Sequence, residues 1–136
     1  MNKHRLLWII PLGLSFFLTS PAFGKRIVFH GIPVIQNRSS ADLSHNVKLD
    51  NNQKITNAAI ITEEDGKYFW ATRDKRELLY QSMNNFDLFI DLKTGGYIKI
   101  ITKGGKFGYM EHIAIPGMKA FTYWGNILAY NPKDLK

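Results

Sequence analysis

The chain has 136 residues, a formal net charge of +7 at pH 7 and no cysteine. The missing cysteines exclude disulfides, thiolate nucleophiles, cysteine-based zinc sites and the lipid-modified cysteine of a bacterial lipoprotein. Without its first 24 residues, the chain is still long enough for one domain that is stabilised by its hydrophobic core alone.

The first 24 residues have the pattern of a signal peptide. The basic segment Met1–Arg5 precedes the apolar run Leu6–Thr19, and small residues stand at Ala22 and Gly24. We expect cleavage after Gly24 or, as a second choice, after Ala22. The apolar run is shorter than the roughly 20 residues of a membrane span, so no transmembrane segment is expected after cleavage. The sequence therefore predicts an exported bacterial protein, periplasmic or secreted, with residues 25–136 as one domain.

The mature chain begins with segments typical of strands and of a loop. Ile27–Phe29 and Ile32–Ile35 are β-branched runs, and Pro33 would confine the second to the edge of a sheet. Residues 37–53 are rich in Ser, Asn and Asp and predict a long, mobile loop.

A hairpin and a short helix are expected next. Residues 55–62 and 67–73 predict two strands joined by a turn at Asp65-Gly66. Residues 74–77 resemble a capping box and predict a helix through about Ser82, with Leu78 and Leu79 facing inward.

The clearest alternation lies in residues 86–93. Its even-numbered apolar residues alternate with Asp87, Phe89, Asp91 and Lys93. We therefore expect a half-buried strand whose Asp87 and Asp91 lie on a solvated face. Glycine-rich turns at 94–96 and 103–106, and Pro116-Gly117, then predict strands over 97–102, 107–115 and 118–124. The predicted fold is mainly β, an antiparallel meander or small barrel-like sheet with one short helix.

Glu111 and His112 are adjacent and are the weak candidates for catalysis. Neighbouring side chains of a strand point to opposite faces, so we expect the two to be separated and favour a structural role. Arg73 or Lys119 is the expected partner of Glu111 if that carboxylate faces the interior. No histidine spacing indicates a metal site, and no cofactor is expected.

Basic and aromatic residues gather in the C-terminal half. Lys3 and Arg5 lie in the signal peptide, which leaves +5 for the mature chain, and residues 67–136 carry all of it. The same half holds 13 of the 14 mature aromatic residues. The candidate ligand-binding residues are Trp70, Arg73, Lys75, Arg76, Tyr97, Lys99, Lys103, Lys106 and Trp124.

This pattern predicts a non-enzymatic domain that binds an anionic envelope component, a glycan or a partner protein through a basic-aromatic face. Nucleic acid is not an expected partner in the exported compartment. One alternative is a small hydrolase or lyase with His112 as general base. Another is an envelope or secreted protein that acts only by docking to other proteins.

Four short motifs also resemble the pattern of small exported proteobacterial proteins of unknown function. They are Phe69-Trp-Ala-Thr-Arg73, Gly96-Tyr-Ile98, Glu111-His-Ile113 and Phe121-Thr-Tyr-Trp-Gly125. The resemblance covers roughly residues 67–125. The resemblance implies export and one small domain, and it carries no activity.

Overall fold

Nine strands and one short helix make up the described part of the computed structural model, residues 25–104, 107–117 and 119–131. The expected signal peptide and Lys106 lie outside these residues. The elements are β1 (Arg26–Ser40), β2 (Ser44–Lys48), α2 (Asn51–Thr56), β3 (Ala59–Glu64), β4 (Lys67–Trp70), β5 (Arg76–Ser82), β6 (Phe86–Ile90), β7 (Tyr97–Ile101), β8 (Tyr109–Ile115) and β9 (Lys119–Tyr130).

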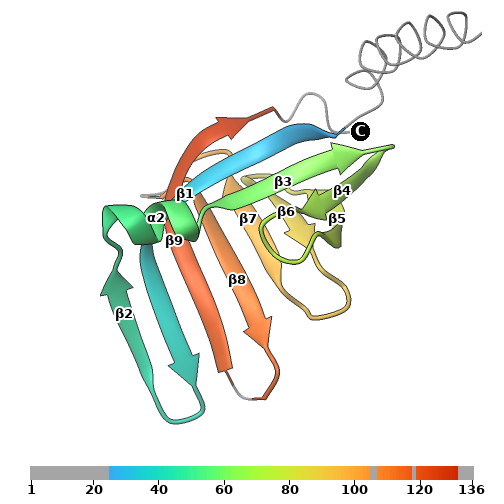
Figure 1. Ribbon diagram of the computed structural model, residues 1–136. Helices are drawn as coiled ribbons and strands as arrows, with labels where there is room; N and C mark the ends of the chain where they lie inside the picture. The colour runs from blue at the N-terminus through green and yellow to red at the C-terminus, as the bar shows by residue number, and fades with distance from the viewer. Residues whose placement is uncertain (1–24, 105–106, 118, 132–136) are drawn as a thin grey trace, which may run out of the picture.

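The strands form an antiparallel meander that closes on itself (Figure 1). The sheet order is β2-β1-β3-β4-β5-β6-β7-β8-β9, and an additional pairing of β1 with β9 closes an eight-stranded barrel. The predicted mainly β fold with a barrel-like sheet and one short helix is therefore confirmed. Closure leaves only β2 and the strand ends outside the barrel wall.

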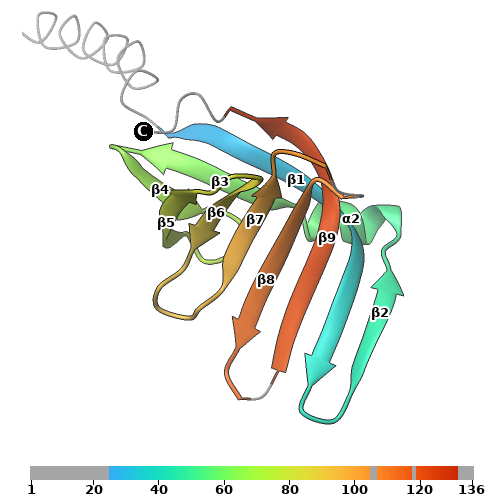
Figure 2. The same cartoon turned by 180° about the vertical axis from the view of Figure 1, so that it is seen from behind.

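Strand β1 changes partner halfway along one of its sides. It pairs there with β3 over Arg26–Gly31 and with β2 over Ile35–Ser39, while β9 pairs along its other side from Phe29 to Ser40. Pro33, which has no N–H to donate, lies in the gap between the two ladders, so its place is not the sheet edge that the sequence predicted. Beyond the barrel, β2 and the adjoining ends of β1, β9 and β8 extend as a projecting sheet (Figures 1 and 2).

Two expected elements were wrong. Residues 37–53 do not form one long loop, because they contain the end of β1, all of β2 and the start of α2. The helix expected over 74–82 is strand β5, which follows a turn in which Asp74 and Lys75 adopt φ values of 56° and 51°. The capping box occurs instead at Asp50 and Gln53, where it starts α2.

Aromatic and branched side chains fill the inside of the barrel. Fully buried members include Trp70, Phe29, Phe89 and Tyr109. Two glycines make room for the Tyr109 ring, since a Cβ on Gly31 would stand 2.5 Å from that ring and one on Gly125 2.7 Å from it. The barrel therefore has a packed interior, as small barrels do.

Strand β6 presents the face opposite to the one expected from its pattern. Phe89 is fully buried, and Asp87 and Asp91 are only 4% and 1% exposed, whereas Leu92 is 74% exposed. The buried Asp87 accepts hydrogen bonds from Ser82 and Tyr130, and Asp91 accepts them from the Thr94 hydroxyl and the backbone N–H of Lys93. The predicted solvated face is thus wrong, because donors from β5, from the turn after β6 and from β9 satisfy both carboxylates.

Candidate functional site

Glu111 and His112 lie on opposite faces of β8, as strand geometry predicted. Glu111 is fully buried and stands opposite Ile98 of β7 and Tyr123 of β9. His112 is half-buried on the outer side, opposite Tyr97 and Thr122. The adjacent pair is therefore not a catalytic dyad.

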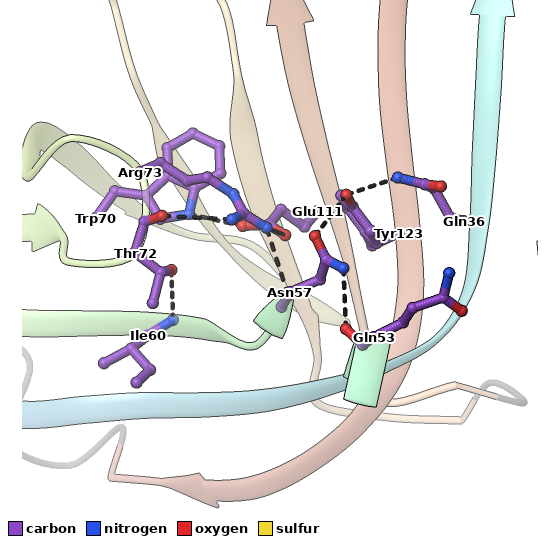
Figure 3. Close-up of polar contacts among 9 residues, drawn as sticks. All are labelled: Gln36, Gln53, Asn57, Ile60, Trp70, Thr72, Arg73, Glu111 and Tyr123. Atoms are coloured by element: carbon purple, nitrogen blue, oxygen red, sulfur yellow. Dashed lines mark hydrogen bonds and ion pairs between the residues drawn. The ribbon is translucent and has the colours of Figure 1, made fainter. Parts of the chain in front are cut away.

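The buried carboxylate of Glu111 is held by two donors (Figure 3). Arg73 Nη2 donates to Oε1 at 2.8 Å, and the indole Nε1 of Trp70 donates to Oε2 at 2.7 Å. Arg73, one of the two partners expected for Glu111, is the residue that pairs with it. Burial raises the pKa of Glu111 above its usual value, while the charge and hydrogen bonds of Arg73 and the Trp70 bond oppose that rise.

A chain of hydrogen bonds links this ion pair to α2 and β1. Arg73 donates to the backbone oxygen of Asn57 at 3.4 Å, and the Asn57 side chain accepts from the Tyr123 hydroxyl at 3.0 Å. The Tyr123 hydroxyl in turn accepts from Gln36 at 2.7 Å. Burial raises the pKa of Tyr123, against the lowering effect of Arg73. The chain ties the end of α2 to the barrel wall, which is a structural role.

Two buried polar atoms near this cluster have no hydrogen-bond partner among the described residues. They are Arg73 Nε and the hydroxyl of Tyr109. Burial, together with the carboxylate of Glu111, raises the pKa of Tyr109 far above its usual value, so that hydroxyl is a neutral donor.

The outer side of His112 shows no partner for acid–base chemistry. The ring stacks on Tyr97 at 5.2 Å between centroids, and Nδ1 lies 3.0 Å from the Thr122 hydroxyl. Within residues 25–104, 107–117 and 119–131, no titratable group shares a hydrogen bond with this imidazole. A general base normally needs a positioned second group, and the geometry gives this hypothesis no support.

The outward residues of β6 to β9 form a continuous surface, which we call the outer face. Its members are Phe86, Leu88, Ile90, Tyr97, Lys99, Ile101, Met110, His112, Thr122 and Trp124. Lys99, Met110 and Trp124 are direct neighbours in one row across β7, β8 and β9. Lys99 Nζ lies 4.2 Å from the centroid of Phe86, and no carboxylate stands among these residues.

The structure brings only some of the predicted ligand-binding residues together. Tyr97, Lys99 and Trp124 share the outer face. Lys103 and Lys99 both line a hollow of about 470 Å³. These residues therefore form one surface, while Lys106 lies outside the described residues.

The other predicted residues are engaged elsewhere. Trp70 is 2% exposed inside the barrel and offers no surface for stacking, and Arg73 is committed to Glu111. Lys75 pairs with Glu64 at 3.0 Å, and Arg76 lies 3.5 Å from Asp91. Burial alone would raise the pKa of Asp91, yet the bonds from Thr94 and Lys93 and the Arg76 charge hold it below its usual value.

Sequence reasoning missed the apolar part of the outer face. Phe86, Leu88 and Met110 were expected to pack inward or were not considered as surface residues, and each is half-buried on the outside. The sequence does place hydroxyl and backbone donors within five residues of Asp87 and Asp91. Such donors allow these carboxylates to face inward, and this was the signal that could have been used.

No described helix has the length and apolar character needed to cross a bilayer, and no three potential ligand residues of the described chain gather as a metal site. Neither a protein-family model, nor a curated protein, nor a solved structure matches the chain.

Proposed function

We propose that this protein is an exported, non-enzymatic module that binds an acidic, glycan-like ligand on its outer face. The row of Lys99, Met110 and Trp124 carries the proposal. It places a cation and a flat indole on one face of a sheet, beside the stacked rings of Tyr97 and His112.

Charge and shape fit such a ligand. Neither Lys99 nor Lys103 forms an ion pair with a carboxylate of the described residues, so both can attract acidic groups. Half-exposed rings offer flat apolar area at low conformational cost, while their polar tips stay available for hydrogen bonds.

The proposal is tested by titrating oligogalacturonate, an acidic sugar chain, into the mature protein and recording binding by calorimetry. Binding should weaken at least about tenfold between about 0.01 M and 1 M salt, because the Debye length falls from about 30 Å to about 3 Å. Neutral dextran should bind at least about tenfold more weakly than oligogalacturonate, since it lacks the charge.

Matched variants locate the surface. K99Q and W124A should each weaken binding at least about fivefold, since each removes about 1 kcal/mol of contact. K54Q removes one positive charge from α2, which lies on the opposite side of β9 from the outer face (Figures 1 and 2), and should change binding less than twofold. Undetectable binding at low salt, or equal losses in K99Q and K54Q, contradicts the proposal.

Docking to a partner protein is the second candidate, favoured by exposed apolar residues next to the outer face. Leu79 is 51% exposed and Leu92 is 74% exposed, and both line a hollow of about 680 Å³ between β5 and β6. A complex from the envelope fraction that survives high salt and is lost in L92Q would support this candidate over the first.

A further inference from the structure

A separate hollow lies at the end of the barrel, away from the outer face. It encloses about 300 Å³ and is lined by the turn before β5, by Asp91 and Thr94, and by the end of β8. Strand β7 pairs with β8 only as far as His112, so Ile113–Ile115 continue with β9 alone on their other side. These residues and Pro116 give the hollow an apolar wall about 10 Å long by strand rise.

The facing wall carries two arginines, Arg73 and Arg76, on one short turn. The turn is closed by a bond from the Arg76 N–H to the Arg73 oxygen at 3.3 Å. Its two central residues, Asp74 and Lys75, lie in the left-handed region, at φ 56° and 51°. Such a conformation costs about 1–3 kcal/mol per residue, so this turn is held in place by its surroundings.

Each guanidinium is fixed from behind by a buried carboxylate. Arg73 is bound to Glu111, which is fully buried, and Arg76 lies 3.5 Å from Asp91, which is 1% exposed. Both carboxylates have further donors, since Glu111 also accepts from Trp70, and Asp91 also accepts from the Lys93 N–H and the Thr94 hydroxyl. The two carboxylates therefore hold the guanidinium groups of Arg73 and Arg76 in place.

Donors remain unused on this wall. Arg73 Nε is buried without a partner and, in Figure 3, lies on the side of the guanidinium away from Asn57. Arg76 uses its Nε for Asp91, and its two terminal nitrogens have no other hydrogen bond to the described residues. The exposed Asp74 is the one lining carboxylate outside these pairs. The Arg76 side chain is 39% exposed, so its terminal nitrogens can donate to a group in the hollow that brings acceptor oxygens.

We infer that this hollow binds a small amphipathic carboxylate, with its head on Arg73 and Arg76 and its hydrocarbon chain along Ile113–Pro116. A carboxylate matches the planar donors of arginine, and the apolar wall supplies burial for an unbranched chain. This site is independent of the outer face and of the ligand proposed for it.

The test uses octanoate as the probe and the mature protein labelled with ¹⁵N. Amide shift changes should concentrate in residues 72–76 and 113–116. R76Q should weaken octanoate binding at least tenfold, because it removes the one lining arginine that is not locked into the Glu111 pair. Octanol should bind at least tenfold more weakly than octanoate because it lacks the charge.

K93Q is the matched control. Lys93 lines the neighbouring hollow but not this one, so this variant should change octanoate binding less than twofold. W124A, which alters the outer face, should also leave it unchanged, and this separates the site from the proposed function.

I115D gives a second route if R76Q lowers stability. It places a carboxylate on the apolar wall and should abolish octanoate binding. Unchanged binding in either R76Q or I115D, or equal losses in R76Q and K93Q, overturns the inference. Shift changes confined to the outer face overturn it as well.

Discussion

Removing either partner of the Arg73–Glu111 pair should destabilise the barrel strongly, and the loss of stability should be larger when Arg73 is removed than when Glu111 is removed. Breaking a buried ion pair by truncating one side costs about 3–5 kcal/mol, because the other charge stays buried without a partner. E111M leaves Arg73, whose side chain is 18% exposed and can turn toward water. R73M leaves Glu111, whose side chain is 0% exposed and has only Trp70 as donor.

We therefore expect E111M near the lower end of that range and R73M near the upper end. At about 4 °C per kcal/mol for a domain of this size, the melting temperature should fall by about 12 °C and about 20 °C respectively. The double variant E111M/R73M should cost less than R73M alone. It removes both charges and leaves mainly the Trp70 indole N–H unpaired, at about 1–3 kcal/mol.

The pH dependence follows from the direction of the Glu111 pKa. Burial raises this pKa, and in R73M the opposing charge of Arg73 is gone. A carboxyl with a raised folded-state pKa gives stability that is fully present below its unfolded value and is lost as pH rises through the folded value. The deficit of R73M should therefore be small near pH 4 and grow toward pH 7.

The assay is urea unfolding followed by tryptophan fluorescence and by circular dichroism at several pH values. Coincident transitions would show two-state behaviour and allow a double-mutant cycle. Additive losses in the double variant, a smaller loss in R73M than in E111M, or a deficit that shrinks with rising pH would refute this account.

Two further predictions test the barrel interior. F89A should lower the free energy of unfolding in urea by about 3–5 kcal/mol, because Phe89 is fully buried. L92A should change it by no more than about 0.5 kcal/mol, because Leu92 is 74% exposed. The reverse order would show that β6 has its other face inside. Tyr109, Tyr123 and Tyr130 have pKa values raised chiefly by burial, so an ultraviolet titration should leave these three tyrosines protonated past about pH 10. Raised phenol pKa values give stability that is complete below about pH 10 and lost above it, and full ionisation at that pH with a native circular dichroism spectrum would contradict their burial.

The local pattern of the sequence determined the strands from residue 86 onward and the turns between them. Alternation in residues 86–93, glycine-rich turns and Pro116-Gly117 act through backbone preferences and side-chain period, which need no distant partner. The same period placed Glu111 and His112 on opposite faces of β8. Arg73 was named as one of two possible partners of Glu111, because a buried carboxylate requires a cation or donors.

Tertiary structure alone decided which face of each strand is inside and how the sheet closes. In β6 the alternation is equally consistent with either orientation. The outcome depends on Ser82, Thr94 and Tyr130, which donate hydrogen bonds to the buried Asp87 and Asp91. Residues 74–82 have a helical start signal, yet pairing with β4 and β6 makes them a strand. The pairing of β1 with β9, and the meeting of Arg73 and Arg76 with the end of β8, join residues far apart in the chain, and no local pattern encodes such contacts.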